Sequence, residues 1–403
     1  MRRAERRSHP DGMSTTDTLR TERRARLFTR PFVLLGLAEL AYFAAAGVAV
    51  YALPLYVTGP LGSDTAGAGL AFGAFAVVAL VARPFAGRAT DTRGRRPLLL
   101  AGALLCAVCM ALMPLAGSLA GVVGLRLVLG LAEAAFFVAA VAALMDIAPR
   151  DRIGEALSYN SLGLYLGLTA GPPLGELLVR GAGFTAAWWA AALLAAVAAG
   201  LSVLVGETRT PGPAPAGERK LIHRPSVPVG LVFLASVVAM GGFLAFAALH
   251  AETVRLENAS LPLATYGVVV VVCRIAFATV PDRLPPLRLG AAALAAMAAG
   301  LLVLALSPTP AGAVAGAAVM GLGITFSTPA LFAAIFAKAG PDERGAASGT
   351  ASASIDLGLG IGPMLLGVVA QSVGIPWAFG AAAGIALAGA AWALVLALRV
   401  RAT

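Results

Sequence analysis

Long runs of apolar residues, rich in Ala, Leu and Val, follow one another along the chain between short polar segments. Most runs reach about twenty residues, enough for a helix to cross a roughly 30 Å hydrocarbon core. Continuous apolar runs favour helices over barrel strands, which are about ten residues long and alternate in polarity. We predict an all-α membrane protein with twelve transmembrane helices, near 31–57, 66–86, 97–117, 120–147, 154–179, 184–205, 228–250, 263–280, 288–307, 312–337, 345–372 and 376–398.

The composition agrees with this class. Of the 403 residues, 59% are hydrophobic and 12% are charged, with a mean hydropathy of +0.87. A soluble domain of this length could not bury so much apolar surface. The formal net charge is +10. Because it belongs to loops and tails, we expect membrane lipid, and no nucleic acid, as the partner of these charges.

Lys and Arg residues are distributed unevenly between alternate loops. With a cytoplasmic N-terminus, all 30 fall on the inner side except Arg180 and Arg255 outside and Arg126 within a span. The positive-inside rule therefore predicts a multi-pass protein of the cell membrane with both termini cytoplasmic. We interpret the first span as an uncleaved helix, because it is too long for a signal-peptide core. The start could be Met1 or Met13.

Identical residues recur at a constant spacing of 191 positions. The pairs are Arg83 and Arg274, Asp91 and Asp282, Gly154 and Gly345, and Pro172 and Pro363. They relate spans two to five to spans eight to eleven, and halves with an even number of spans make parallel repeats. We therefore predict a basic cytoplasmic tail over 1–30, a six-helix bundle over 31–205, a cytoplasmic linker over 206–227, a second six-helix bundle over 228–398 and a cytoplasmic C-terminus over 399–403.

The loop GRATDTRGRRPLLL, residues 87–100, carries four arginines and an aspartate between two apolar runs. It matches the signature G-x-L-A-D-R-x-G-R-R through Gly87, Asp91, Gly94, Arg95 and Arg96, with Ala89 and Thr92 as departures. The chain from 31 to 398 thus resembles the major facilitator superfamily, which implies two parallel six-helix bundles. The second repeat keeps Asp282, Arg283 and Arg288 but has Pro285 in place of the glycine.

We interpret this loop as a conformational latch, with Asp282 and Arg283 as its counterpart in the second repeat. Asp91 can accept hydrogen bonds from arginines and from the N-terminal end of a neighbouring helix. Gly87 and Gly94 allow close approach and a tight turn. Such a cluster would stabilise one conformer of an alternating-access cycle by ~1–3 kcal/mol. The alternative is that its arginines only satisfy the positive-inside rule.

A second signature lies in span five, GLTAGPPLGE. Gly167, Gly171, Pro172 and Gly175 resemble the G-x-x-x-G-P-x-x-G-G pattern of the superfamily's proton-coupled exporters, with Glu176 in place of the last glycine. Small residues spaced by four allow close helix packing, and the proline bends the span. The alternative is generic small-residue packing in a glycine-rich protein. The resemblance implies a twelve-span drug:proton antiporter.

Charged residues within the spans are the candidates for proton coupling, because each is costly to place there. Arg126 and Glu133 lie seven residues apart on one face of span four, and Glu39 lies in span one. Burial in a low dielectric favours the protonated form of a carboxylate. We predict Glu133 as the main protonation site, with Arg126 biasing its proton affinity and Glu39 as second carboxylate. The alternative for both carboxylates is a structural salt bridge, and Asp356 is interpreted as structural or gating.

Spans seven and ten carry no charge, so their polar and aromatic residues are the candidates for the substrate cavity: Phe243, Phe246, Phe326, Ser327 and Phe332. This set suits a hydrophobic substrate, such as a lipophilic cation or zwitterion. The favoured function is proton-coupled export of hydrophobic small molecules. A nutrient importer or facilitator is the alternative. We expect no enzyme, cofactor or metal, and we expect one chain to function as a monomer.

Overall fold

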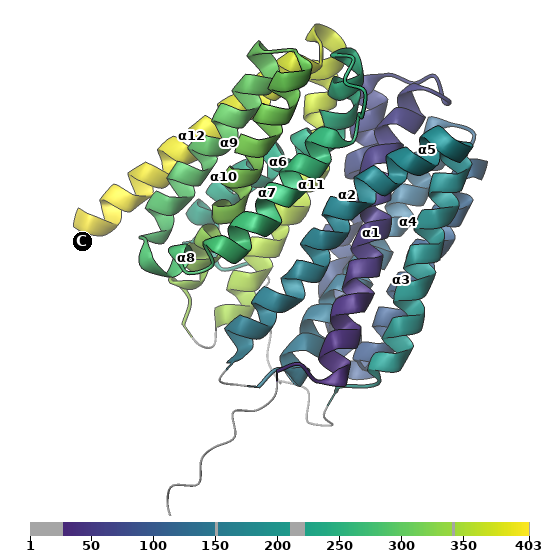
Figure 1. Cartoon of the computed structure of the whole chain (residues 1–403). Helices are drawn as coiled ribbons and strands as arrows, with labels where there is room; N and C mark the ends of the chain where they lie inside the picture. Colours follow the sequence, from purple (N-terminus) through teal and green to yellow (C-terminus); the bar gives the residue numbers. More distant parts are fainter. Residues whose placement is uncertain (1–26, 150–151, 210–221, 341–342, 403) are drawn as a thin grey trace, which may run out of the picture.

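The computed structural model describes residues 27–149, 152–209, 222–340 and 343–402, and these residues form helices joined by short loops (Figure 1). The predicted tail and linker fall partly outside the described residues, and their boundaries stay predictions. The helices are α1 (Arg30–Thr58), α2 (Thr65–Arg93), α3 (Arg95–Leu112), α4 (Leu119–Ile147), α5 (Ile153–Val205), α6 (Val227–Thr253), α7 (Leu261–Ala276), α8 (Val280–Arg283), α9 (Pro286–Leu306), α10 (Pro310–Phe336), α11 (Arg344–Val373) and α12 (Ile375–Ala402).

The prediction of twelve helical spans is confirmed over the described residues. Ten helices are long and apolar enough to cross a membrane, and the shorter apolar helix α7 adds another. The long helix α5 is bent at Gly183, whose φ of +82° is open to glycine but costly for other residues, so α5 supplies two spans. The span predicted over 263–280 is shorter in the structure, because α7 ends at Ala276.

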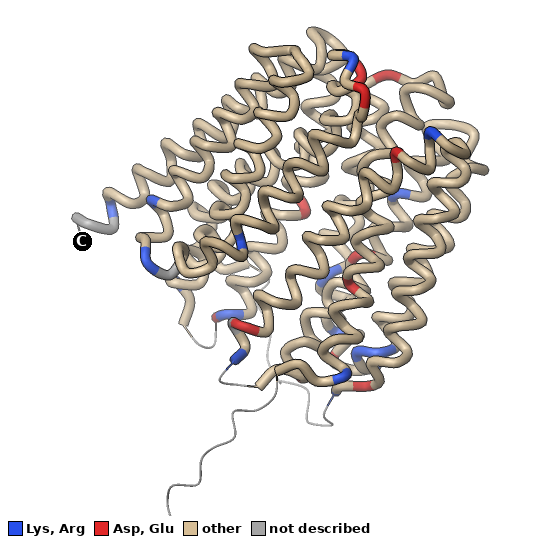
Figure 2. Tube along the Cα trace, viewed as in Figure 1, with Lys and Arg blue, Asp and Glu red and all other residues tan. Residues whose placement is uncertain are grey.

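Helices α1 to α5 lie on one side of the molecule and α6 to α12 on the other (Figure 1). We call these groups the N half and the C half. We call the end of the molecule that carries Arg95 the inner end and the opposite end, which carries Arg180, the outer end, following the predicted orientation. Charged residues gather near the two ends, and a few lie along the helices between them (Figure 2).

The glycine stripe of α5 packs against α1 of the same half. A Cβ added at Gly171 would lie 2.5 Å from the Gly47 α-carbon, and one at Gly167 would lie 2.7 Å from the Leu40 carbonyl oxygen. Glycine is therefore required at this crossing for the two backbones to approach. The close packing predicted from the signature is confirmed.

The two halves meet along two seams, α2 against α11 and α5 against α7. Towards the outer end of the first seam, a Cβ added at Gly367 would lie 3.2 Å from the Gly69 α-carbon. At its outer tip, Gln371 donates a hydrogen bond of 2.6 Å to Asp64. On the second seam, a Cβ added at Gly267 would collide with Thr169. The halves are thus in direct backbone contact over their outer portions.

Candidate functional site

An ion pair joins the two halves near the middle of the first seam. Arg83 of α2 donates from Nε to Asp356 Oδ2 at 2.5 Å and from Nη2 to Oδ1 at 2.8 Å. Asp356 on α11 is 2% exposed and Arg83 14% exposed. A bidentate pair of this kind is a strong, directional interaction, and removing one partner leaves a buried charge uncompensated. The attraction between these two charges therefore helps to hold the halves together, and a change in either charge would alter how the halves are positioned.

Glu133 of α4 lies beside this ion pair. Its carboxylate interacts electrostatically with Arg83, Asp356 and Arg126, and it lies next to the Tyr42 hydroxyl of α1. The Tyr42 ring stacks on Phe136, with ring centroids 4.0 Å apart, which holds the hydroxyl in place. Glu133 is half-buried. Among the described residues, Arg83 and Asp356 form the one ion pair between the halves that lies inside the spans. The predicted protonation site, Glu133, is within electrostatic reach of this pair.

Arg126 is buried and binds backbone oxygens. Its Nε donates to the Ala71 carbonyl at 3.0 Å and its Nη2 to the Phe72 carbonyl at 2.9 Å, while the guanidinium lies 4.7 Å from the Phe75 ring centroid. These hydrogen bonds hold the side chain of Arg126, a residue of α4, against the backbone of α2. Arg126 is thus placed as a fixed positive charge near Glu133, and its predicted influence on proton affinity would act through the electric field.

Glu39 lies apart from this cluster, between α1 and α5. Its carboxylate is 5% exposed and accepts a hydrogen bond of 2.7 Å from Asn160 Nδ2. The Asn160 Oδ1 atom is buried and has no hydrogen-bond partner among the described residues. The structure therefore does not bring Glu39 together with Glu133, and its role as second carboxylate stays a prediction.

The predicted latch is a network within the N half. Arg95 lies 3.7 Å from Asp91 and donates to Asp146 of α4 at 2.9 Å. The backbone N–H groups of Arg95 and Arg96 at the start of α3 donate to Glu207, at 3.0 and 3.3 Å. The network joins the inner ends of α2, α3, α4 and α5.

Glycines in the latch behave differently from one another. Gly94 has a φ of +103° and separates α2 from α3, so the predicted tight turn is confirmed. A Cβ added at Gly87 would meet no atom within 4 Å, so the predicted close approach at Gly87 is wrong in this conformation, because Gly87 faces open space. In the second repeat, Arg283 is exposed, and the Asp282 side chain lies outside what the structure describes.

Glu207 has a perturbed pKa. Burial acts to raise the pKa of its carboxyl group, but the backbone N–H groups of Arg95, Arg209 and Arg96 outweigh burial and lower it from its ordinary value. Because the native pKa lies below the unfolded one, this contact stabilises the folded loop at neutral pH. The stabilisation is lost as the pH falls through the lowered pKa.

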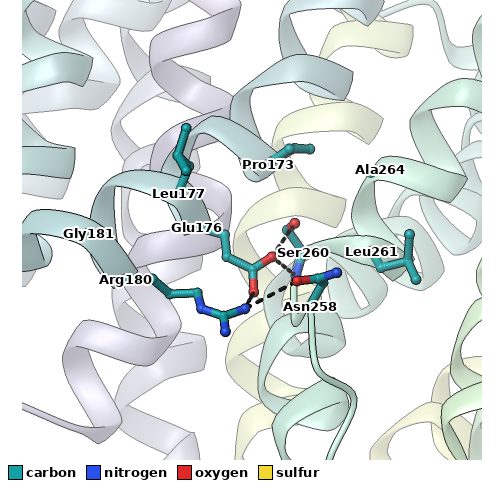
Figure 3. A pocket seen from close by; sticks show the side chains of 9 residues that line it. All are labelled: Pro173, Glu176, Leu177, Arg180, Gly181, Asn258, Ser260, Leu261 and Ala264. Atoms are coloured by element: carbon teal, nitrogen blue, oxygen red, sulfur yellow. Dashed lines mark hydrogen bonds and ion pairs between the residues drawn. The ribbon is translucent and has the colours of Figure 1, made fainter.

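Glu176 closes the outer end of the second seam (Figure 3). Its carboxylate is buried and accepts hydrogen bonds from the backbone N–H groups of Ala259 and Ser260, at 2.8 and 3.0 Å, and from Ser260 Oγ at 2.6 Å. These donors precede α7, so a residue of the N half caps a helix of the C half. Arg180 lies 3.6 Å from Glu176 and donates to the Glu257 carbonyl at 3.0 Å.

A cavity of about 570 Å³ lies at this closure. It is lined by Pro173, Glu176, Leu177, Arg180, Gly181, Asn258, Ser260, Leu261 and Ala264 (Figure 3). Glu176 is the residue that departs from the span-five signature. The departure therefore adds a polar contact between the halves, and the small glycine of the signature could not make it.

Replacing Glu176 with glutamine is expected to open the outer end. The amide would place an N–H group against backbone donors, and hydrogen bonds to a charged group contribute about 1.5–3 kcal/mol, so the population should shift by roughly ten- to a hundredfold. A cysteine placed at Thr169 should then react at least about tenfold faster with an impermeant maleimide added outside. Glu257→Gln is the matched control, since it keeps the backbone oxygen that accepts from Arg180. Equal reaction rates in the two variants would contradict this role.

The predicted substrate-cavity residues are mostly packed inside the C half. Phe243 and Phe246 on α6 are completely buried, and the Phe243 ring centroid lies 5.1 Å from that of Tyr266. Ser327 is also buried and lies 2.5 Å from the Ser236 hydroxyl. Phe332 packs against other aromatic rings, and Phe326 is half-buried. Their contact with a substrate stays a prediction.

Three contacts of charged residues were not predicted from the sequence, and they are those of Arg83, Glu176 and Glu207. The sequence predicts Arg83 as an inner charge and as a member of the 191-residue repeat, and it predicts no contact for Glu176 or Glu207. One signal was available for Arg83, since it recurs as Arg274 at the repeat spacing. Nothing in the spacing pointed to Asp356, because the residue 191 positions before it is Tyr165.

The comparisons with known proteins agree with this architecture. The family model of the Major Facilitator Superfamily matches residues 35–350 and 231–403. The chain belongs to the major facilitator superfamily. It is therefore a multi-pass membrane protein and a secondary transporter, as the superfamily is.

Relatives and solved structures cover most of the chain. An uncharacterized MFS-type transporter of Burkholderia mallei is 32% identical over 87% of this chain and 88% of its own length. An uncharacterized MFS-type transporter of Salmonella typhimurium is 30% identical over 86% of this chain and 91% of its own length. The human organic anion transporter MFSD10 superposes with a TM-score of 0.68 at 19% identity, covering 90% and 98%. A mutant form of the nucleoside transporter NupG superposes with a TM-score of 0.73 at 13% sequence identity, covering 92% of this chain and 99% of its own. These two structures share the fold.

Proposed function

We propose that this transporter is a proton-coupled antiporter that exports hydrophobic or amphipathic small molecules by alternating access. The observation that carries the proposal is the position of Glu133 beside the Arg83–Asp356 ion pair. Arg83 and Glu133 belong to the N half and Asp356 to the C half. A proton on Glu133 can therefore change how strongly the two halves attract each other.

The coupling works through competition for one guanidinium. With Glu133 protonated and neutral, Arg83 is available to Asp356 alone, and the ion pair holds the seam together. When Glu133 loses its proton, its negative charge attracts Arg83 as well, which weakens the pair with Asp356. The halves then separate more easily along α2 and α11. Arg126, fixed on backbone oxygens, adds a constant positive potential that favours release of the proton.

Substrate class and direction rest on other features. The stripe of Gly167, Gly171, Pro172 and Gly175 resembles that of proton-coupled exporters, and drug efflux follows from this resemblance. The substrate-cavity candidates of the C half are mostly aromatic, with no amide among them for binding a sugar. We place the transporter in the cell membrane with both termini in the cytoplasm. A single chain supplies both halves, so we propose the monomer as the working unit.

Everted membrane vesicles test this function. With an imposed pH gradient, acid inside, they should accumulate compounds from a panel of lipophilic cations, anions and zwitterions, and a protonophore should collapse that accumulation. Vesicles lacking the protein are the control. Accumulation that is insensitive to the protonophore would show that transport is not coupled to protons. Uptake found only in right-side-out vesicles would favour the nutrient importer.

A further inference from the structure

The two seams place an arginine at equivalent positions of the two repeats. Arg83 of α2 and Arg274 of α7 are 191 positions apart, and each reaches a residue of the opposite half. Their partners, Asp356 of α11 and Tyr165 of α5, are also 191 positions apart. The repeats therefore make the same contact twice, once with a carboxylate and once with a phenol.

The guanidinium of Arg274 is only partly satisfied. Arg83 uses its Nε and Nη2 atoms, which form one edge of the guanidinium, to hold both oxygens of Asp356. The same edge of Arg274 donates from Nη2 to Tyr165 Oη at 2.7 Å, but its Nε atom is buried and has no hydrogen-bond partner among the described residues. Half of a carboxylate-binding edge is thus unused, and an unsatisfied buried donor is costly and uncommon.

The charge and the aromatic neighbours of Arg274 also suit an anionic ligand. Across the described parts of the chain, no carboxylate forms an ion pair with Arg274. The guanidinium lies 4.1 Å from the Tyr165 ring centroid. Tyr266 of α7 interacts electrostatically with both, and Phe243 of α6 packs against Tyr266. A positive charge therefore lies against the Tyr165 ring and within electrostatic reach of Tyr266, at the boundary between the halves.

We propose that Arg274 is the anion subsite of the substrate site and binds the carboxylate of an amphipathic aromatic molecule. This inference rests on the proposed transport function and narrows its substrate class. The substrate carboxylate takes the place that Asp356 occupies in the first repeat, on the Nε–Nη2 edge, when the α5–α7 seam parts. Its apolar part lies against Tyr165 and Tyr266. Arginine suits this task because its planar edge matches a carboxylate in two hydrogen bonds.

Equilibrium binding tests the subsite without any gradient. The probes are tritiated 2-naphthoate, its methyl ester and 2-naphthylmethylammonium, and the full-length protein is held in nanodiscs at a fixed neutral pH. The wild type should bind the acid at least about tenfold more tightly than the ester or the ammonium, since one charge-assisted bidentate contact separates them. Arg274→Gln should remove that preference and leave ester affinity unchanged. Lys338→Gln, an exposed charge in the same half, should change neither.

A second variant covers the case in which Arg274→Gln does not fold. Tyr165→Asp supplies the carboxylate that the first repeat already has, so it should occupy the edge of Arg274 and lower the ratio of acid affinity to ester affinity by about tenfold. Equal affinity of the wild type for acid and ester, no measurable binding of the acid, or an undiminished preference in Tyr165→Asp would overturn the subsite. Because no gradient is imposed, this failure is distinct from a failure of proton coupling, which only the vesicle measurement reports.

Discussion

Replacing Glu133 with glutamine is expected to abolish transport driven by a pH gradient while substrate exchange without a gradient continues. Glutamine has the size of a protonated glutamate and can keep its place beside Tyr42, but it carries no proton to release. Arg83 then stays committed to Asp356 at every pH. The equilibrium between the conformers then no longer responds to the proton, and the link between proton flow and substrate flow is lost.

Proteoliposomes separate these two activities. Gradient-driven accumulation by Glu133→Gln should fall to the level of liposomes without protein, whereas counterflow of unlabelled against labelled substrate at equal pH should remain measurable. Glu155→Gln is a matched control in the same half, because Glu155 is exposed and pairs with Arg152 at the inner end. Accumulation by Glu133→Gln at the wild-type rate would remove Glu133 from the mechanism.

The fold was predictable because the main physical constraint on a membrane protein determines the order of apolar and polar residues along the sequence. Each span must be apolar over the thickness of the bilayer, and each loop must be polar, so helix number and the duplication can be found from hydropathy and spacing. Gly94 and the α5 glycine stripe were predictable for a related reason. A positive φ demands glycine as a local property of one turn, and small residues spaced by four mark the face of α5 that can approach another helix closely.

The site was predictable only in part. Glu133 and Arg126 stand out because a charge within a span is expensive, which marks each residue singly. The contact of Arg83 with Asp356 joins residues 273 positions apart, and hydropathy contains no information on which faces of α2 and α11 meet. Comparison of the repeats also fails there, because it finds identical residues, and Asp356 corresponds to Tyr165. The close approach predicted at Gly87 was wrong, because a glycine in a signature does not show that a neighbouring helix lies against it.

Neutralising the Arg83–Asp356 pair is expected to shift the equilibrium between conformers more than any other change on the first seam. Asp356→Asn leaves Arg83 without its bidentate partner, and Arg83→Gln leaves the carboxylate of Asp356 buried and alone. Removing one member of a buried pair costs about 3–5 kcal/mol. The double variant Arg83→Gln with Asp356→Asn leaves no unpaired charge, so its effect should be smaller than the sum of the two single effects.

Single-molecule distances between labels on the two halves measure this directly. Cysteines at the exposed positions Arg88 and Lys338 report the separation of the halves at the inner end, in a background without native cysteines, and the population ratio gives a free energy for each variant. The double-mutant cycle should show a coupling of about 2–3 kcal/mol. Gln371→Ala is the control, since it removes a hydrogen bond between α11 and the start of α2 at an exposed position and should cost less than about 1 kcal/mol. Additive effects of Arg83→Gln and Asp356→Asn would mean that the ion pair does not hold the seam. In that case, competition for Arg83 could not transmit the charge of Glu133 to the opposite half.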